Sequence, residues 1–305
     1  MILIITHKTD FTVDFVINKL NKQKIKYKRF NCEDILKNDY CLKFYNTSSY
    51  SILGEAKYKS VWFRRTKLPE ISNLRKEEKI YILKETDYLI KNMISSLQVK
   101  KWLSHPNYVY RAENKLLQLQ EALKIGFKIP ATLITNSHKE LKNFIKTYNY
   151  DIIIKPLSYS KIDYCEGSKF FFTSKVSSNI INDIDSYDLT PCIYQQNIAK
   201  EYEIRVTVVN NEIFVAAVDS QKDEDTKNDW RRKNLQFYKI DLPNTIKIKC
   251  IGLVKKLNLK FGAIDLIKTP KGEYIFLEIN PNGQWAWIEA QTGLQISDAI
   301  IKYLT

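Results

Sequence analysis

The sequence predicts a mixed α/β (α+β) fold, and three features of its pattern lead to that prediction. The first third alternates short apolar runs with helical repeats, which is typical of a small parallel sheet built from βαβ units. Later, two alternating runs meet at an Asn-Asn pair, and two more meet at a Pro-Lys-Gly turn. Both are signals of antiparallel hairpins. At 305 residues, the chain is long enough for more than one domain.

The first third supplies the strands and helices of the βαβ units. Residues 1–6 are almost entirely apolar and predict a buried strand, and residues 10–21 follow with helical spacing. Residues 26–31 predict a second strand. After a less regular segment, residues 60–65 predict another strand and residues 74–101 a long amphipathic helix. We therefore expect one small parallel sheet in this part of the chain.

The rest of the chain begins after residues 103–114, where a proline and a loss of periodicity predict a domain boundary. We expect three units, at residues 1–105, 106–190 and 191–305, of which the last two are α+β units. Their helices are expected near residues 115–125, 138–148 and 245–257, and their strands at residues 127–136, 151–158, 192–198 and 203–221, before the hairpin that starts at residue 262.

The composition excludes several classes of protein. No apolar run approaches the roughly 20 residues that span a bilayer. The first charged residues follow the apolar run at the start of the chain, whereas a signal peptide has its charge first. The five cysteines are scattered without a Cys-x-x-Cys pair, which is atypical of a disulfide framework or a zinc site. We therefore expect a cytoplasmic protein with reduced thiols.

The net charge of +14 is concentrated in the first third. Residues 1–110 hold 21 Lys and Arg against 11 Asp and Glu, and the remaining residues hold 27 against 23. A basic surface is typical of proteins that bind nucleic acid or another anionic partner. An AT-rich genome also produces the abundance of Ile, Asn, Tyr and Lys seen here, so both explanations of the charge stay open.

Three polar residues interrupt the two apolar runs of the last hairpin. With Lys271 and Gly272 as a two-residue turn, Asp265 lies directly opposite Glu278, and Asn280 lies two residues along on the same face. Like charges that face each other are destabilising. A hard cation removes that repulsion, and Mg²⁺ takes carboxylate and amide oxygens while sharing its shell with phosphates. The hairpin therefore predicts a metal site, and a pair of solvent-exposed acidic residues is the alternative.

Basic residues that suit phosphate occur in other predicted elements. Lys155 ends a run of three isoleucines, and Lys115 opens a helix. Glu203 and Arg205 share one face of an alternating strand, and an arginine fork suits a phosphate group. The polar loop at residues 229–234 carries two adjacent arginines. Each of these residues has a simpler interpretation as part of a solvated surface or an exposed ion pair.

These motifs, in this order, resemble the ATP-grasp superfamily. They are ENK (113–115), IIIKP (152–156), YQQNI (194–198), EIRVTVV (203–209), DWRR (229–232) and GAIDLI with YIFLEINPNG (262–283). VWFRR (61–65) and NGQWAWIEAQTGLQISDAI (282–300) are similar, more narrowly, to peptide-modifying ligases of microviridin type, the graspetide synthetases, with grasp-with-spasm maturases as relatives. The resemblance covers nearly the whole chain. It implies an ATP-grasp fold with an N-terminal βαβ pre-ATP-grasp domain and two α+β subdomains that clasp ATP.

The resemblance also implies a role for each residue of these motifs. Many family members have Glu where this chain has Gln196, which puts the side-chain contact to the adenine amino group in doubt here and leaves a backbone carbonyl to accept that hydrogen bond. The implied roles are Asp265, Glu278 and Asn280 as ligands of two Mg²⁺ ions, Lys115 and Lys155 on the phosphates, Gln195, Gln196, Asn197 and Ile198 as the hinge beside the adenine with Lys200 nearby, Glu203 on the ribose, and Arg205, Arg231 and Arg232 facing the γ-phosphate and the acyl phosphate.

The function that the resemblance implies is ATP-dependent ligation on a peptide. Asp or Glu side chains of a ribosomally made precursor peptide, with a leader and an acidic core, would be activated as acyl phosphates. Attack by Thr or Ser hydroxyls gives ω-esters and attack by Lys amines gives ω-amides, which close macrocycles. Arg64 and Arg65 are candidates to meet a peptide carboxylate, or else form a basic strand end in solvent. ATP and Mg²⁺ would be the cofactors, and a homodimer is one expected assembly.

Two other functions stay open. An ATP-grasp ligase that joins amino acids to a metabolite or a protein terminus needs neither the VWFRR segment nor a precursor peptide. A basic, non-enzymatic nucleic-acid-binding protein explains the charge but not the three polar residues of the hairpin. Such a protein would also concentrate aromatic and basic residues in one stripe, which this sequence does not do. We therefore expect neither a nucleic-acid partner nor a membrane partner.

Overall fold

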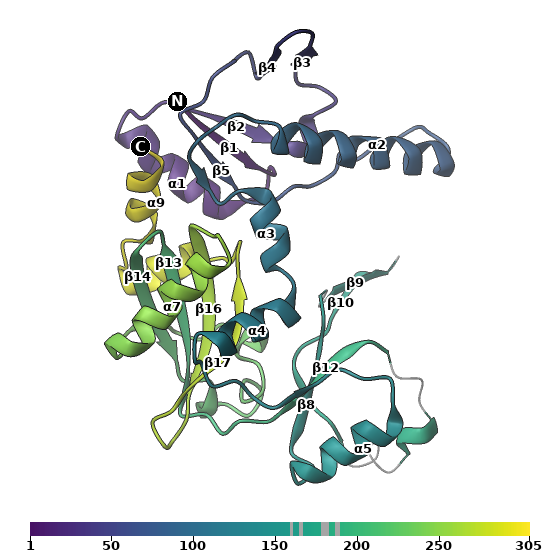
Figure 1. Ribbon diagram of the computed structural model, residues 1–305, viewed down its shortest axis with the longest axis vertical. Coiled ribbons are helices and arrows are strands. Elements are labelled where there is room, and N and C mark those ends of the chain that lie inside the picture. The colour runs from purple at the N-terminus through teal and green to yellow at the C-terminus, as the bar shows by residue number, and fades with distance from the viewer. Residues whose placement is uncertain (159–160, 165–166, 178–182, 187–189) are drawn as a thin grey trace.

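A parallel sheet forms the upper part of the molecule in the computed structural model, which describes residues 1–158, 161–164, 167–177, 183–186 and 190–305 (Figure 1). All its neighbouring strands are parallel, as the βαβ pattern predicts. The strands occur in the order β2 (Tyr27–Asn31), β1 (Ile2–Thr6), β5 (Ser60–Phe63) and β6 (Trp102–Leu103), and β1 and β2 are joined by helix α1 (Phe11–Lys22). Strand β1 is buried along its whole length, which explains its continuous apolar run.

Helix α2 (Lys76–Ser95) projects from this domain and is shorter than predicted (Figure 1). It ends at Ser96, and the following residues extend toward β6, so the predicted helix over residues 74–101 is too long at its C-terminal end. A hairpin of β3 (Tyr40–Phe44) and β4 (Ser48–Ile52) also lies in this part, and the sequence pattern did not predict it. Its strands are mostly exposed, so they lack the apolar alternation that marks a half-buried strand.

The largest sheet is antiparallel and lies in the middle of the molecule. Its order is β15 (Tyr238–Lys239), β14 (Glu212–Val218), β13 (Tyr202–Val209), β16 (Phe261–Lys268) and β17 (Tyr274–Asn280). The predicted hairpin at Asn210 joins β13 to β14, and Asn210 takes the left-handed conformation that such a turn requires. Helices α7 (Asn244–Lys256) and α4 (Lys115–Lys124) cover one face, and α8 (Ala286–Thr292) and α9 (Ile296–Leu304) pack on the other.

A smaller sheet forms the third part, with α5 (His138–Thr147) packed on one face. Its order is β11 (Ser174–Lys175), β8 (Ile152–Pro156), β12 (Cys192–Gln196) and β7 (Thr132–Leu133). Strand β7 is much shorter than the predicted strand over residues 127–136, because Pro130 has no N–H to offer a neighbouring strand. A hairpin of β9 (Lys161–Tyr164) and β10 (Gly167–Phe170) extends from this sheet toward α2 (Figure 1).

Short helices complete the described chain. Helix α3 (Pro106–Ala112) leads from the first domain into α4. The remaining elements are single turns of 3-10 helix, named η1 (Cys32–Asp34), η2 (Ile184–Ser186), η3 (Ser220–Lys222) and η4 (Trp230–Arg232). No helix among the described residues is long and apolar enough to cross a membrane.

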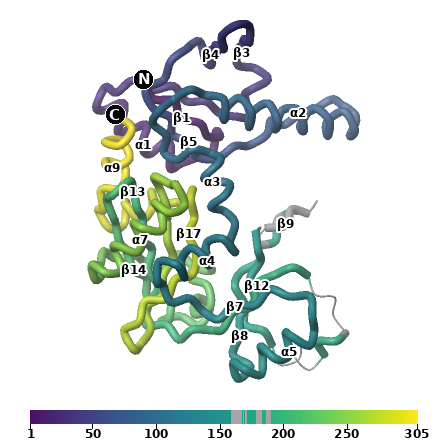
Figure 2. The backbone as a smooth tube through the Cα atoms, viewed as in Figure 1, coloured from purple at the N-terminus to yellow at the C-terminus, as the bar shows by residue number. Residues whose placement is uncertain are grey.

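The last helix returns to the first domain, so the two ends of the chain lie near each other (Figure 2). The Ser60 hydroxyl donates to the Leu304 carbonyl over 2.6 Å, and residues of α1 and α9 share one apolar cluster. The sheet that carries α5 has an apolar cluster of its own. The boundaries expected at residues 105 and 190 remain predictions, but the first and last thirds of the chain share a core.

Candidate active site

The register of the β16–β17 hairpin brings the three predicted metal ligands together. Asp265 pairs with Glu278, and Asn280 lies two residues further along β17. The turn differs from the predicted one: it has three residues, with Gly272 in the left-handed conformation, and it shifts the pairing by one residue. A β-bulge between Asp265 and Leu266 shifts the pairing back. Two deviations therefore cancel, and the predicted pair of carboxylates is restored.

The three side chains converge on one another. The Asn280 side-chain nitrogen donates to a Glu278 oxygen over 3.0 Å and to an Asp265 oxygen over 3.4 Å. Burial raises the pKa of Asp265 to about 7, and the charge of Glu278 adds to that shift while Arg205 opposes it. Burial acts on Glu278 too, but Lys115 and Lys155 outweigh it and lower the pKa of that residue. The surrounding charges therefore favour an ionised Glu278 beside an Asp265 that titrates near neutrality. A bound cation would favour the ionised form of both carboxylates.

These oxygens are the donors that Mg²⁺ prefers, although they do not form a purely acidic cluster. Among the described residues, no group of three or more His, Cys, Asp or Glu side chains could hold a metal ion. The hairpin instead offers two carboxylates and one amide, which leaves coordination positions for phosphate oxygens and water. The residues present thus fit an Mg²⁺ ion that shares its shell with a nucleotide.

Helix α4 brings Lys115 to this hairpin. Asn114 caps the helix by accepting from the backbone N–H groups of Leu116 and Leu117, which places Lys115 in the first turn. The Lys115 ammonium forms an ion pair with Glu278. Gln118, one turn further on, also reaches the hairpin, as described below. The helix therefore fixes a cation next to the predicted metal ligands.

Lys155 lies on the face of the small sheet that is opposite α5. It pairs with Ile193, and Gln195 pairs with Ile153, so these four side chains share a face while Ile152, Ile154 and Tyr194 pack toward α5. Burial lowers the pKa of Lys155 to about 8, with Glu278 opposing that shift. The influence of Glu278 shows that the ammonium lies within the field of the hairpin carboxylates.

The predicted hinge residues end strand β12. Gln195 is buried, and its amide nitrogen donates to the Thr132 hydroxyl over 2.8 Å. Gln196 pairs with Ile152, so by strand alternation its side chain is directed toward the α5 face, and its backbone is the part left for a ligand on the opposite face. Asn197 bonds to Asp151 through both its backbone and its side chain. Ile198 follows as a partly buried residue in the connection to β13.

Strand β13 contributes an ion pair and an arginine. Lys200 and Glu203 pair over 2.8 Å with both side chains at most 10% exposed. Arg205 pairs with Asp265 across the strands, and its Nη1 lies 3.2 Å from an Asp265 oxygen. Within the described part of the chain, the buried Nε of Arg205 has no partner, and Nη1 has this ion pair but no hydrogen bond. A buried donor of a charged group is costly to leave unpaired, so Arg205 fits a phosphate oxygen.

The structure separates Arg231 from Arg232, which the sequence could not do. Arg231 donates through Nε and Nη2 to the carboxylate of Asp229, at 2.8 and 2.6 Å. These bonds raise the pKa of Arg231, with smaller contributions from the charges of Glu278 and Asp265. Arg232 instead bonds to Ser174 and lies with its guanidinium 5.3 Å from the Phe172 ring. Arg231 is therefore the arginine whose charge acts on the hairpin site.

The two arginines after β5 also differ. Arg64 is 1% exposed, and each nitrogen of its guanidinium has a hydrogen-bond partner, so it presents no free donor to a peptide. It is also not the basic strand end in solvent that was the other expectation for this residue. Arg65 is exposed, and its Nη2 donates to the Asn282 carbonyl over 3.3 Å. Of these two, only Arg65 retains donors that a carboxylate could reach.

Comparison with known families agrees with this arrangement. The profile of the RimK-like ATP-grasp domain matches residues 112–304, which is more than half of the chain. The chain belongs to the RimK-like ATP-grasp family. Residues 1–109 of this ATP-grasp protein match the MvdD pre-ATP-grasp domain. The fold and family that the motifs predicted are thus confirmed.

Solved structures with the same fold cover nearly the whole ATP-grasp protein. A RiPP-associated ATP-grasp ligase from Chryseobacterium gregarium, in complex with ADP and a leader and core peptide, superposes with a TM-score of 0.89 at 29% identity, over 99% of this chain and 96% of the other. The macrocyclase MdnC from Microcystis aeruginosa, bound to precursor peptide MdnA, gives a TM-score of 0.86 at 31% identity over 100% and 99%. The resemblance to graspetide synthetases is therefore confirmed.

Curated relatives align with a smaller share of the chain than these solved structures do. A glutathione synthetase from Buchnera aphidicola is 28% identical over 198 residues, which are 58% of this chain and 54% of that protein. A ribosomal protein bS6–L-glutamate ligase from Salmonella newport is 24% identical over 200 residues, 64% of each chain. The chain thus spans between half and two thirds of these relatives.

Sequence reasoning missed two residues that support the site of this ATP-grasp protein. Gln118 is buried, donates to the Ile279 carbonyl over 2.8 Å and accepts from the Ile279 N–H over 3.1 Å, which holds the strand between Glu278 and Asn280. Asp229, 5% exposed, fixes Arg231 as described above. Gln118 could have been noticed as a polar residue on the buried side of an amphipathic helix. Asp229 lies in a polar loop, where no feature of the sequence distinguishes it.

Proposed function

We propose that this protein is an ATP-dependent ligase that closes macrocycles in a ribosomally made precursor peptide. The observation on which the proposal rests is the convergence of Asp265, Glu278 and Asn280 with Lys115 and with cations from the other strands, in a chain that aligns end to end with peptide macrocyclases. Oxygen ligands surrounded by lysine and arginine suit a nucleotide with its metal, and such an arrangement serves phosphoryl transfer.

The reaction proposed for this site has two balanced steps. A carboxylate oxygen of an Asp or Glu side chain attacks the γ-phosphorus of ATP, the bond to the β-phosphate oxygen breaks, and ADP leaves. The acyl phosphate that results is attacked at its carbonyl carbon by a Thr or Ser hydroxyl, or by a Lys amine. Inorganic phosphate then leaves, one proton is released, and an ω-ester or ω-amide remains. The peptide loses one water for each ring.

The residues of the chain would bind, orient and neutralise charge. Asp265, Glu278 and Asn280 would hold Mg²⁺, two ions in our proposal, and the metal would neutralise phosphate charge when bound. Lys155 and Arg205, whose Nε has no hydrogen-bond partner among the described residues, would contact phosphate oxygens. Such contacts align the reactants and stabilise charge that develops in the transition state.

Other predicted residues would bind the nucleoside and the peptide. The backbone after Gln195 would contact the adenine, and Glu203, which keeps one carboxylate oxygen besides its bond to Lys200, would contact the ribose. Arg231 would face the acyl phosphate. Arg65 would meet a carboxylate of the acidic core peptide. In this proposal Arg232 acts less directly, because it is bound to the segment at Ser174.

The test is a reaction with a small peptide encoded beside the gene. The protein, the peptide, ATP and Mg²⁺ are incubated, and intact mass and ADP release are recorded. Loss of one or more waters that depends on Mg²⁺ and ATP supports the proposal. ADP release stimulated by free amino acids, with the peptide unchanged, would replace it with amino-acid ligation, the activity named for the curated glutamate ligase. Size-exclusion chromatography with light scattering decides whether the protein is a homodimer.

A further inference from the structure

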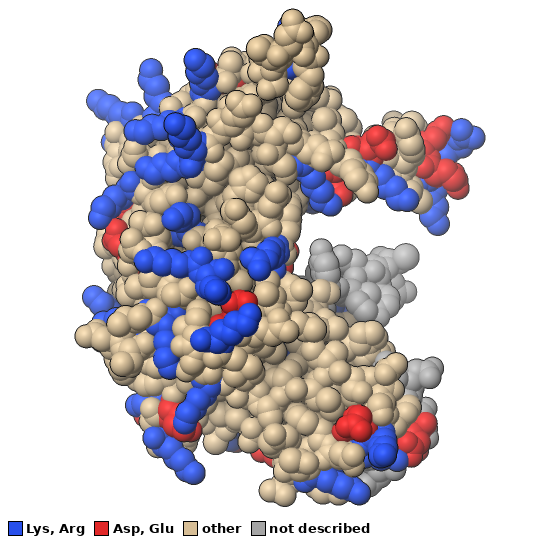
Figure 3. Space-filling view, viewed as in Figure 1, with Lys and Arg blue, Asp and Glu red and all other residues tan. Residues whose placement is uncertain are grey.

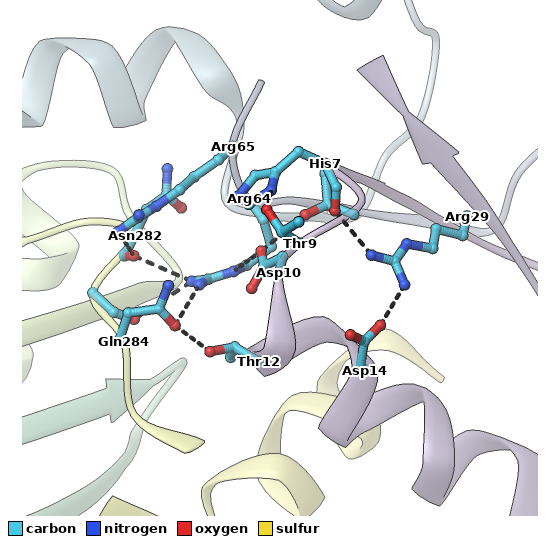
Figure 4. Close-up of polar contacts among 12 residues, drawn as sticks. His7, Thr9, Asp10, Thr12, Asp14, Arg29, Arg64, Arg65, Asn282 and Gln284 are labelled. Carbon is cyan, nitrogen blue, oxygen red and sulfur yellow. Dashed lines mark hydrogen bonds and ion pairs between the residues drawn. The ribbon is translucent and has the colours of Figure 1, made fainter. Parts of the chain in front are cut away.

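Arg64 is held between the first domain and the hairpin site (Figure 4). Its Nε lies 3.3 Å from an Asp10 oxygen, and the Thr6 hydroxyl donates to the same oxygen over 2.8 Å. Burial alone would raise the pKa of Asp10, but the charge of Arg64 and the bond from Thr6 outweigh it and lower that pKa. Arg64 and Asp10 therefore form a charged pair with almost no contact with solvent, and such pairs are stable only when their other donors are also bonded.

The remaining donors of Arg64 bind the loop that follows Asn280. Nη1 donates to the carbonyl oxygens of Asn282 and Gly283, at 3.2 and 3.4 Å. Nη2 donates to the side-chain oxygen of Gln284 over 3.4 Å, as Figure 4 shows. All three acceptors lie within four residues of Asn280.

The same loop is held on its other side by the sheet. The Gly283 N–H donates to the Asn280 carbonyl over 3.1 Å. A Cβ at Gly283 would lie 2.5 Å from the Cβ of Ala263, which pairs with Asn280 across the strands. The loop therefore cannot approach the sheet more closely. On its other side Arg64 contacts three of its residues, Arg65 adds a bond to the Asn282 carbonyl, and the Thr12 hydroxyl donates to Gln284.

We propose that Arg64, oriented by Asp10, is a positioning residue that fixes the loop at residues 281–284 and through it the direction of the Asn280 side chain. The inference rests on the proposed function of Asn280 as a metal ligand. It gives the first domain a part in the metal site without any contact with the nucleotide. The three acceptors need the planar fork of an arginine, and a lysine ammonium cannot reach all of them.

The competing explanation is that the buried pair only stabilises the fold. A second, more exposed arginine–aspartate pair at the start of α1 provides a control. Arg29 pairs with Asp14 and donates to the carbonyls of His7 and Lys8, but the described contacts of Arg29 do not include the loop at 281–284 (Figure 4). Loss of the Arg29 pair, whose side chains are 21% and 43% exposed, therefore removes an ion pair of α1 without releasing that loop. The charge-retaining Arg64→Lys separates the loss of the loop contacts from the loss of a buried charge.

The experiment compares Arg64→Met, Arg64→Lys and the control Arg29→Met with the native protein. Hydrogen exchange of the backbone amides at residues 281–285 is measured without ligand, and Mn²⁺ binding in the presence of ADP is measured by electron paramagnetic resonance. Both Arg64 variants should exchange faster in this segment. They should also bind Mn²⁺ about 10-fold more weakly, the usual effect of removing a group that orients a metal ligand. Arg29→Met should change neither.

Two results would overturn the inference. The first is native exchange at residues 281–285 in Arg64→Lys, which retains the charge and remains informative if Arg64→Met fails to fold. The second is an equal effect of Arg29→Met, which would reduce Arg64 to a contribution to stability. If the native protein binds no Mn²⁺ with ADP, the metal assignment of the hairpin fails instead, while the exchange measurement still decides whether Arg64 fixes the loop.

Discussion

The register of the hairpin places Asp265 opposite Glu278. The cost of that like-charge contact depends on the cations beside the two carboxylates. Arg205 lies beside one carboxylate and Lys115 beside the other. The two cations offset the repulsion between the carboxylates, and the Nε of Arg205 has no hydrogen-bond partner among the described residues. The site therefore combines neutralised carboxylates with a donor that suits an anion.

Removal of either carboxylate tests the metal assignment. Asp265→Asn and Glu278→Gln keep the shape of each side chain but remove a charge, so ADP release should fall by about 100-fold or more, the size of effect seen when an electrostatic stabiliser is lost. The steady-state rate of ADP release measures this. Glu273→Gln, beside the turn of the same hairpin and with its side chain paired to Lys128, is the control and should leave the rate unchanged. Native rates in both test variants would remove the metal assignment.

Lys155 should make nucleotide binding depend on pH in a defined direction. Its pKa is lowered to about 8 in the ligand-free protein, and phosphates would raise that pKa by favouring the charged form. Between about pH 8 and pH 10, ADP binding should therefore take up a proton at Lys155 and weaken as pH rises, and Lys155 should contribute no uptake well below pH 8. Calorimetry near pH 8.5 in two buffers of different ionisation enthalpy measures the uptake.

Lys155→Met is the matched variant for that measurement. It should abolish the proton uptake and weaken ADP binding roughly 10- to 100-fold, since a hydrogen bond to a charged group contributes about 1.5–3 kcal/mol. Uptake that persists in Lys155→Met would assign the titration to another group.

At the scale of elements, β17 is the edge strand of the large sheet, and α4 covers part of its free edge. Gln118 occupies the two backbone groups of Ile279, and the Phe276 N–H donates to the Lys128 carbonyl over 2.8 Å. A covered edge cannot slip by one residue, and such a slip would turn Asp265 and Glu278 to opposite faces. The helix thus secures the register on which the site depends.

Replacement of Gln118 by Met should show that dependence. The change leaves the buried N–H and C=O of Ile279 unsatisfied, which costs about 1–3 kcal/mol of the free energy of unfolding. It should also weaken Mn²⁺ binding with ADP, because Ile279 lies between two proposed ligands. Urea unfolding measures the first effect. Gln120→Met, on the exposed side of the same helix, should change neither quantity. Unchanged stability in Gln118→Met would contradict this account.

At the scale of the whole molecule, α9 joins the first domain to the large sheet. Ile300 is fully buried in a cluster that contains residues of β1, α1 and β13. The basic side chains are spread widely over the left side of the face in Figure 3, and α2 carries both signs of charge. The excess of positive charge therefore does not by itself locate a binding site.

A shared core predicts that the first domain and the large sheet unfold together. Ile300→Ala should lower the free energy of unfolding by about 2–5 kcal/mol, and tryptophan fluorescence and circular dichroism should still report one shared shift of the transition. Ile248→Ala, at a residue of α7 that is 69% exposed, is the control and should have little effect. Loss of structure in the first domain alone would show that α9 does not couple the two parts.

The amino-acid pattern alone was enough to predict the family, the order of the main strands and helices, and the residues that meet at the hairpin. Apolar periodicity predicts β1, α1 and β13 because each buries a continuous face. The hairpin residues could be paired because strand register follows from turn position, although here a longer turn and a β-bulge cancelled. The exposed β3–β4 hairpin was missed because exposed strands have no such pattern. The end of α2 was missed because Leu97 and Val99, which are buried, continue the apolar residues beyond the helix.

The partner that each charged residue contacts could be known only from the packing of the folded chain. Arg64 and Arg65 are adjacent in the sequence, yet one is buried against Asp10 and the other is exposed. Arg231 and Arg232 likewise diverge, because Asp229 binds one of them and Ser174 the other. The direction of a side chain depends on partners that are distant in sequence. A local pattern predicts where a strand ends, and the packing around it determines which partner each side chain meets.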